Sequence, residues 1–160
     1  SLIKKNKNIK ILYSNFFIFN QEKKKKYLKT KQKLLSGMIT KDIIANYTIG
    51  ILTIMIKKDI FQKYKFNPKY EIIGDFDFFI KLSLKYKFYA IQKPLAYYRV
   101  HEKNFSKEKS NLYIKEIKNW LMYNKKFFKK KNIDLINIYF LLKKLQLKKI
   151  LTFIGGLAQK

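Results

Sequence analysis

Cysteine is absent from this chain of 160 residues, and arginine and histidine each occur only once. Without cysteine the protein has neither a disulfide framework nor a thiolate metal site. Proline and glycine are scarce, with two and five copies, and no Gly-rich phosphate-binding loop is present. No uncharged apolar run reaches the roughly 18 residues that cross a bilayer as a helix. Disulfide-rich scaffolds and cysteine-ligated zinc modules are therefore excluded, and a reducing cytoplasm is the expected compartment.

Acidic residues are also scarce, because 10 Asp and Glu stand against 37 Lys and Arg, for a net charge of +27. Such a charge is typical of proteins that bind nucleic acid. It carries less weight here, because Lys, Asn, Ile, Phe and Tyr are abundant while Arg, Ala, Gly and Pro are rare, as in AT-rich coding sequences. The alternative to an enzyme is a non-enzymatic basic protein that binds nucleic acid or an anionic membrane surface.

Apolar and aromatic residues are abundant, with 48% hydrophobic residues, 14 Phe and 12 Tyr. This amount supports a buried core and argues against general disorder. The length fits one domain, or part of one. Residues 1–8 read like the end of a helix rather than a start. We therefore expect the chain to be a piece of a longer protein.

The first two-thirds of the chain alternate between predicted strands and predicted helices. Apolar runs rich in β-branched and aromatic residues predict buried strands, and the helix at 75–86 is apolar on all sides, which predicts burial. The lysine-rich segment 21–33 reads as an exposed loop, Thr40 as a helix N-cap and Pro94 as a strand breaker. The alternation predicts an α/β fold with a layered core. The predicted strands cover 9–19, 49–56 and 87–92, and the predicted helices cover 40–46, 57–63 and 75–86.

The pattern changes after Ser106 to that of amphipathic, lysine-rich helices. Apolar residues between 113 and 128 fall on one arc of a helical wheel and lysines on the other. A second helix is predicted from Asp134 as its N-cap, with Gly155–Gly156 as its end. We therefore divide the chain into residues 1–106 and a basic amphipathic helical tail, residues 107–160. The apolar faces of this tail either pack on the first part or contact an anionic membrane surface.

The single Arg99 and the single His101 stand two residues apart in the run Tyr-Tyr-Arg-Val-His that ends at residue 101. Arginine offers a planar fork of donors that suits phosphate oxygens, and histidine offers a metal ligand or a proton carrier. In extended backbone, residues i and i+2 point to the same face. The pair therefore predicts one shared site, and a hydrogen-bonded structural histidine is the alternative role for His101.

Asp75 follows Gly74 at the start of the predicted buried helix. Backbone N–H groups and the helix dipole favour an ionised carboxylate there, and such a carboxylate can act as a general base. Asp77 lies about 200° further round the helix, so the two carboxylates do not form a glycosidase-type pair. From spacing alone, a simple N-cap is the alternative role for Asp75.

Three ordered segments resemble the C-terminal half of the catalytic domain of family 2 glycosyltransferases, which have the GT-A fold. They are residues 46–58, residues 66–82 with the run Gly-Asp-Phe-Asp, and residues 94–106 with the run Pro-Leu-Ala-Tyr-Tyr-Arg-Val-His. Residues 2–20 are similar to the helix and strand that follow the metal-binding strand of this family. The resemblance implies a partial GT-A fold of the nucleotide-diphospho-sugar transferase type. Residues 1–106 would form its acceptor-side half, a mixed sheet with flanking helices.

The resemblance also implies an activity, namely inverting transfer of a sugar from a nucleotide-sugar donor such as a UDP-sugar. The acceptor would be a hydroxyl of a glycan or lipid-linked substrate, as in the synthesis of cell-surface polysaccharides. Asp75 would match the catalytic base, with Gly74 beside it and Thr53 near the donor or acceptor. Arg99 and His101 would match the segment that folds over the donor diphosphate, with His101 as a candidate metal ligand. Asp77 would be structural, and no specific nucleic acid is implied.

The chain departs from the family pattern because it contains neither the nucleotide-binding strand nor the Asp-x-Asp metal motif. A donor diphosphate needs a divalent cation, Mg²⁺ or Mn²⁺, with oxygen ligands. We expect the missing N-terminal half to supply most of the ligands of that cation. The chain by itself is then expected to be inactive. We expect it in the cytoplasm, with peripheral contact at the inner face of the cell membrane through the basic tail.

Overall fold

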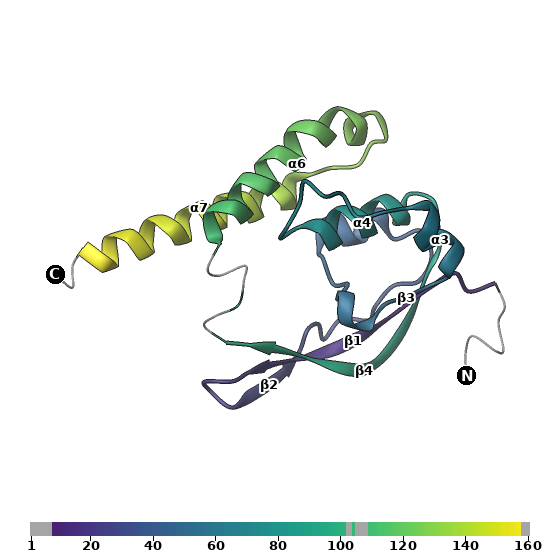
Figure 1. Cartoon of the computed structure of the whole chain (residues 1–160), viewed down its shortest axis with the longest axis horizontal. Helices are drawn as coiled ribbons and strands as arrows, with labels where there is room; N and C mark the ends of the chain where they lie inside the picture. The colour runs from purple at the N-terminus through teal and green to yellow at the C-terminus, as the bar shows by residue number, and fades with distance from the viewer. Residues whose placement is uncertain (1–7, 102–103, 105–108, 158–160) are drawn as a thin grey trace.

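One layer of strands supports one layer of helices in the computed structural model, which describes residues 8–101, 104 and 109–157, with side chains as far as residue 151. The strands form a mixed four-stranded sheet, and the described α-helices all lie on one face of it (Figure 1). The α/β class predicted from the alternation of elements is therefore confirmed. The expectation of a helix end at residues 1–7 and the boundary at residue 106 fall outside the described residues.

Strand β1 (Ile11–Asn20) is the centre of the sheet. Strand β4 (Phe88–Val100) runs parallel to it along one edge. Along the other edge, β3 (Met55–Ile56) pairs antiparallel with residues 11–12, and β2 (Lys25–Leu28) pairs antiparallel with residues 17–20. The first six residues of β1 are buried, as a nearly continuous hydrophobic run between two neighbouring strands predicts. The strand predicted at 9–19 is confirmed.

The exposed loop predicted over residues 21–33 is wrong in its middle, where β2 forms a hairpin with β1. Residues 21–24 make the turn, and Lys24 has a φ of 50° within it. Three of the four β2 side chains are exposed, so the strand depends on main-chain pairing with β1 rather than on burial. Hydrophobic patterning cannot reveal such a strand, because its lysines remain in solvent on an edge.

The single strand predicted over 49–56 is also wrong, because the chain turns at Gly50 into a 3₁₀ turn, η1 (Ile51–Thr53). A Cβ added at Gly50 would lie 2.6 Å from the ring of Phe16, so this close approach to β1 requires glycine. The Thr53 hydroxyl lies 3.0 Å from the carbonyl oxygens of both Ser14 and Gly50 and fastens the turn to β1. The turn leaves three apolar side chains exposed, those of Ile51, Leu52 and Met55.

Pro94 does not end the third strand, because β4 continues through it to Val100. Pro94 lies opposite Asn15, where shifts in register mark a bulge in the pairing with β1. Proline has no N–H group to donate and is tolerated at bulges and strand edges. The prediction is wrong here because β1 keeps pairing with β4 on both sides of the proline, which a local rule for breakers does not anticipate.

The helices predicted at 40–46, 57–63 and 75–86 are confirmed as α2 (Thr40–Ala45), α3 (Lys58–Lys63) and α4 (Gly74–Ser83). The N-cap of α2 is Ile39 rather than Thr40, so that detail of the prediction is wrong. Thr40 is buried, and its hydroxyl accepts a hydrogen bond of 3.0 Å from Ser83 at the end of α4. The Thr40 hydroxyl therefore bonds to a residue of another helix and does not cap α2.

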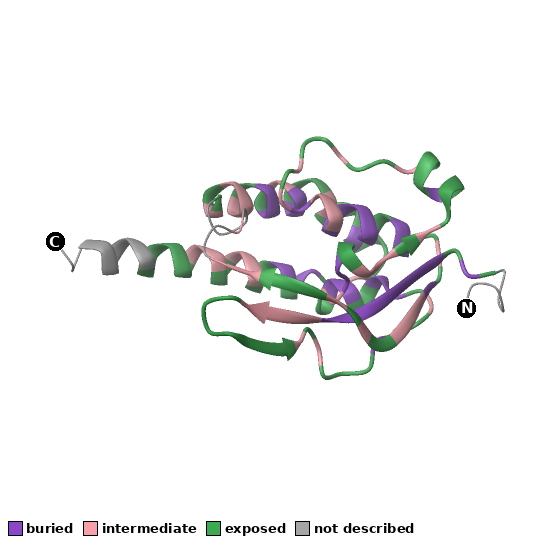
Figure 2. Cartoon of the chain, turned by 60° about the horizontal axis from the view of Figure 1, so that its bottom comes forward, coloured by how far each residue is buried: buried purple, intermediate pink, exposed green. Residues whose placement is uncertain are grey.

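Helix α6 (Ser110–Lys130) confirms the amphipathic helix predicted at 113–128, and it belongs to the core. The indole of Trp120 packs edge-on against Phe76 of α4, with ring centroids 5.1 Å apart, and lies against Phe128. Figure 2 shows buried residues along β1 and along the facing sides of the helices. The largest fully buried side chains are Trp120, Tyr13, Phe78, Phe79, Phe88, Phe128, Ile11, Ile39, Ile43, Ile80, Leu82 and Ile117.

Helix α7 (Ile136–Leu157) returns along α6 and packs on α6 and α2 (Figure 1). Asp134 accepts the N–H of Ile136 at 2.8 Å, which agrees with its predicted place at the start of this helix. The helix continues through Gly155–Gly156, so the predicted stop is wrong. A glycine inside a helix costs only about 1 kcal/mol relative to alanine, so glycine does not by itself end a helix. None of the helices in the described part of the chain is long and apolar enough to cross a membrane.

Candidate functional site

Asp75 stands in the first turn of α4, where the preceding loop enters the helical layer. Its Oδ1 accepts the N–H of Phe76 at 2.7 Å, and its side chain is half-buried. Burial raises the pKa of the Asp75 carboxyl, and the Phe76 N–H and the nearby Tyr47 hydroxyl oppose that rise. A carboxylate with a raised pKa binds a proton more readily near neutral pH, which is what a general base requires.

Two tyrosines from other elements approach the Asp75 carboxylate. Burial and the negative charge of Asp75 raise the pKa of the Tyr47 hydroxyl well above 10, and both raise that of Tyr113 on α6 as well. The Tyr47 hydroxyl is buried and, among the described residues, makes no hydrogen bond of ordinary geometry. Of the two hydroxyls, that of Tyr47 lowers the pKa of Asp75. Sequence reasoning missed both residues, because no spacing along the chain links them to Asp75.

Glu116 of α6 holds the loop that leads into α4. Its two carboxylate oxygens accept the backbone N–H groups of Glu71, Ile72 and Ile73, at 2.8, 3.0 and 3.1 Å. Glu116 is 3% exposed, so these bonds form away from water and are strong. They fix the backbone immediately before Gly74 and Asp75. Sequence reasoning missed Glu116 too, although it is the only acidic residue between positions 110 and 130 and this signal was available.

Asp77 lies on the other side of α4 and is occupied by structural contacts. Its Oδ1 accepts the indole N–H of Trp120 at 3.0 Å, and its Oδ2 accepts Lys81 Nζ at 2.6 Å. The side chain is 2% exposed. The structure therefore gives the two carboxylates different partners, on different sides of α4 as their spacing predicts. Asp77 ties α4 to α6, while Asp75 is half-buried and accepts the Phe76 N–H.

Gly74 and Thr53 have different environments. A Cβ added at Gly74 would approach no atom closer than 4.0 Å, the ring carbon Cδ1 of Phe66, so the fold itself does not demand glycine there. The Thr53 hydroxyl is within hydrogen-bonding distance of the carbonyls of Ser14 and Gly50, which gives it a structural task in η1. A substrate contact at either residue stays a prediction.

Arg99 and His101 lie at the end of β4, opposite the end of β1. The Arg99 side chain is exposed, and its carbonyl and the backbone of His101 are bound by Asn104, with His101 N donating to Asn104 Oδ1 at 2.7 Å. Among the described residues, no hydrogen bond or ion pair joins either side chain to Asp75. The structure therefore presents a helix-mouth carboxylate and a strand-end basic pair as two separate parts.

Metal-ligating side chains do not cluster in the part of the chain that the structure describes, where no group of three or more His, Asp or Glu residues converges. His101 as a metal ligand therefore stays a prediction that depends on ligands from elsewhere. In comparisons with known proteins, the chain matches no protein-family model and no curated protein. The case for a function therefore depends on the residues and on the geometry described above.

Proposed function

We propose that this chain forms the acceptor-side half of an inverting glycosyltransferase of the GT-A type, with Asp75 as the general base. The observation that carries the proposal is the half-buried Asp75 carboxylate at the mouth of α4, with a raised pKa and a backbone that Glu116 holds in place. The resemblance of residues 46–106 to family 2 glycosyltransferases supports it. A mixed sheet with a parallel β1–β4 pair is compatible with such a fold.

In this reaction the Asp75 carboxylate accepts the proton of the acceptor hydroxyl as the oxygen attacks the anomeric carbon of the donor sugar. The new bond joins that oxygen to the anomeric carbon, and the bond from this carbon to the diphosphate breaks. The nucleoside diphosphate leaves with the bonding electron pair, and the anomeric centre inverts. The Tyr47 hydroxyl nearby remains neutral and helps to hold the carboxylate in the charged form.

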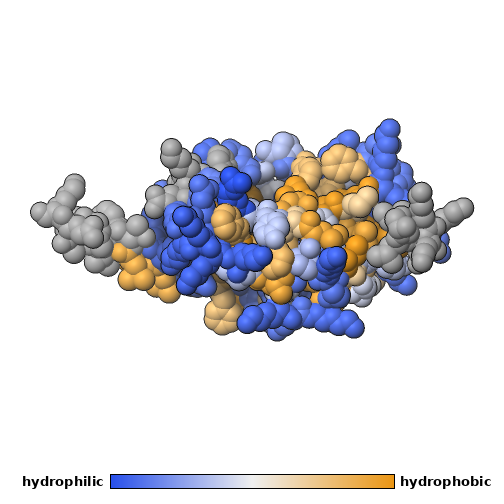
Figure 3. All heavy atoms as spheres, turned by 90° about the horizontal axis from the view of Figure 1, so that it is seen from below, coloured by the Kyte–Doolittle hydropathy of each residue, from blue (hydrophilic) through white to orange (hydrophobic). Residues whose placement is uncertain are grey.

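The donor would be held by parts that lie on other polypeptide segments. Strand β3 pairs only with β1 among the described residues, and the adjacent apolar side chains of Ile51, Leu52 and Met55 are 39–58% exposed. Seen from below in the orientation of Figure 1, hydrophobic side chains gather over part of the molecule (Figure 3). We assign this edge to contact with the donor-binding half. That half would also supply most ligands of a divalent cation, while Arg99 and His101 reach the diphosphate.

The test is the variant Asp75→Asn in the complete enzyme, with a donor and acceptor in hand. Loss of a general base lowers turnover by about a hundredfold or more, and donor affinity should stay nearly unchanged. Asp59→Asn, on an exposed part of α3, is the matched control and should keep full turnover. If Asp75→Asn turns over like the native enzyme, Asp75 is not the base.

A further inference from the structure

The outward face of α7 is apolar, although it lies on the surface. The inward side of this helix packs on the core through Ile138 and Leu142, next to Leu135 just before it. With about 100° between successive residues, six large apolar side chains fall on the opposite side within an arc of about 120°. We name this set the outer face of α7: Ile136, Tyr139, Phe140, Leu147, Ile150 and Leu151, which are 42–68% exposed. Residues 147–151 of α7 are all exposed, and Figure 2 shows this stretch in the colour of exposed residues. An amphipathic helix of a globular protein normally presents polar residues there.

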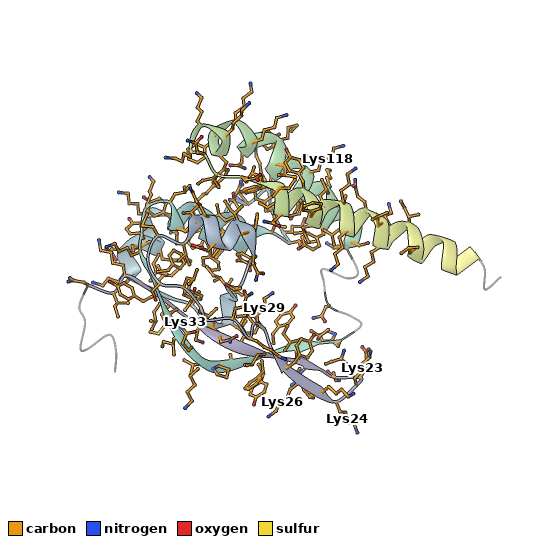
Figure 4. The ribbon with its side chains drawn as sticks, turned by 180° about the vertical axis from the view of Figure 1, so that it is seen from behind. Lys23, Lys24, Lys26, Lys29, Lys33 and Lys118 are labelled. Atoms are coloured by element: carbon orange, nitrogen blue, oxygen red, sulfur yellow. The ribbon has the colours of Figure 1, made fainter. Side chains whose placement is uncertain are left out.

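Lysines lie within and beside this largely apolar surface: by the same spacing Lys143 falls inside the arc, and Lys144 borders it. Lys143, Lys144, Lys148 and Lys149 follow one another along α7, and residues 136–157 contain no acidic residue. A groove of about 760 Å³ runs between α6 and the second half of α7. Ile114, Leu147 and Ile150 give it apolar walls. Lysines 115, 118, 143 and 149 also line it, and Figure 4 shows Lys118 on α6.

This combination selects among the possible occupants of the outer face. A second copy of the chain would bring the same lysines together, and like charges disfavour that contact. An anionic bilayer surface complements both parts, since its phosphates attract lysines and its acyl region accepts apolar side chains. Lysine side chains next to a buried apolar face can extend their ammonium groups to the headgroups.

We propose that the outer face of α7 lies flat on an anionic phospholipid surface, with its apolar side chains at the headgroup–acyl boundary and the lysine-lined groove on lipid phosphates. The helix lies in the interface and does not span the bilayer. This proposal does not rest on the glycosyltransferase activity, because it concerns another face of the molecule. Together, the two proposals would hold Asp75 near a membrane that carries lipid-linked acceptors.

The test is co-sedimentation of the chain with vesicles of neutral phosphatidylcholine and with vesicles that also contain phosphatidylglycerol. We expect binding to the anionic vesicles and little binding to the neutral ones. The double variant Leu147→Ser with Leu151→Ser should lower the partition coefficient about thirtyfold, because two partly inserted leucines are lost. Leu95→Ser with Tyr97→Ser, on β4 and similarly exposed, is the matched control and should bind like the native chain.

A lysine series separates the α7 surface from general charge attraction. Lys143→Gln with Lys149→Gln should lower binding to anionic vesicles about twenty-five-fold, from about fivefold for each lysine at a membrane surface. Lys23→Gln with Lys24→Gln removes the same charge at the tip of the β1–β2 hairpin, far from Lys118 (Figure 4), and should change binding much less. Equal losses in the two pairs would mean non-specific attraction and would overturn the proposal.

A probe at the surface provides a readout that charge alone cannot produce. The chain has a single tryptophan, the buried Trp120, so Leu147→Trp adds an exposed second one. Vesicles with brominated acyl chains should quench the added emission and leave that of Trp120 nearly unchanged. Unquenched emission on bound protein would overturn insertion. A second outcome would also overturn the proposal: the chain does not bind vesicles but forms a concentration-dependent dimer, and Leu147→Ser with Leu151→Ser abolishes that dimer. The outer face of α7 would then contact a second copy of the chain.

Discussion

Asp75 and Asp77 stand two positions apart in one helical turn, yet the structure gives them opposite environments. Asp77 is enclosed by the indole N–H of Trp120 and the ammonium of Lys81, both of which stabilise its charge. Asp75 has one backbone N–H, and burial raises its pKa. A carboxylate that is fully bonded is structural, whereas a carboxylate that is desolvated and only partly bonded is suited to proton transfer.

The variant Tyr47→Phe should raise the pKa of Asp75 further. The Tyr47 hydroxyl lowers this pKa in the native chain, while burial, the larger effect, raises it. Removal of the hydroxyl leaves burial less opposed. Carboxyl-carbon NMR titration of the isolated chain measures the change without any substrate. Tyr27→Phe, on exposed β2, is the control, and an unchanged or lower pKa in Tyr47→Phe would contradict the assignment.

The raised pKa of Asp75 also predicts how stability depends on pH. The folded chain binds the Asp75 proton more tightly than the unfolded chain does. This contribution is therefore fully present below the unfolded pKa and is lost as pH rises through the folded pKa. Between those limits the native free energy of unfolding should fall more with pH than that of Asp75→Asn, which does not titrate. Chemical unfolding of both proteins across this range gives the comparison, and parallel curves would count against a raised pKa.

Arg99→Lys in the complete enzyme should weaken use of the donor by about 1.5–3 kcal/mol in kcat/KM, the range for a hydrogen bond to a charged group. A guanidinium can contact two phosphate oxygens at once, whereas lysine is a single point charge. Lys23→Arg in the β1–β2 turn is the control at equal charge and should be silent. If Arg99→Lys leaves kcat/KM for the donor unchanged, Arg99 does not contact the diphosphate and is a surface residue only.

At the scale of elements, the central contact is between α6 and the start of α4. From α6, Glu116 accepts the three consecutive backbone N–H groups just before α4, and Trp120 donates its indole N–H to Asp77 of α4. One turn of α6 therefore sets both the entry and the rotation of α4. Because α4 carries Asp75, the proposed catalytic geometry depends on a helix that the sequence pattern assigned to a tail.

Glu116→Gln should lower the free energy of unfolding by about 2–4 kcal/mol. The carboxylate makes charge-assisted bonds to buried N–H groups, and an amide keeps only one acceptor oxygen and brings a donor towards other donors. Denaturant unfolding measures the loss. Glu71→Gln removes an exposed ion pair with Lys109 and should cost less than about 1 kcal/mol. Similar losses in the two variants would mean that Glu116 is not the main contact of this loop.

At the scale of the whole molecule, two surfaces remain without a partner among the described residues. The sheet edge at η1 and β3 exposes apolar side chains next to a strand that pairs on one side only. The outer face of α7 exposes apolar side chains among lysines. Lysines lie beside both surfaces, including Lys57 and Lys58 directly after β3. A strand that pairs on one side only can accept a further strand, which is why we assign a protein contact to the first surface. The lysine-lined groove beside α7 is why we assign a lipid surface to the second.

Residues 1–160 alone should transfer no sugar from UDP-sugars with Mg²⁺ or Mn²⁺. The described residues contain no cluster of metal-ligating side chains to hold the diphosphate, and a free sheet edge favours aggregation over catalysis. A radiolabelled-donor assay on the purified chain tests this, with the complete enzyme as the positive control. Steady transfer by the isolated chain would show that the donor site is built within these 160 residues.

The sequence by itself determined the elements whose burial follows from local pattern. The strand at 9–19, the buried helix at 75–86 and the amphipathic helix at 113–128 all show their environment in their own periodicity, and Asp75 was identified from its place at a helix start. This periodicity arises because the residues that face the core are apolar, and they are spaced along the chain as the repeat of the helix or strand requires.

Only the tertiary structure decided the elements and contacts that depend on a distant partner. Strand β2 exists because β1 offers its backbone, η1 turns because Phe16 lies against Gly50, and β4 passes Pro94 because pairing resumes beyond a bulge. Glu116 and Tyr47 reach the Asp75 region from other elements. Such contacts leave no periodic trace in the sequence, since each pairs residues whose separation along the chain is set by the fold and by no local repeat.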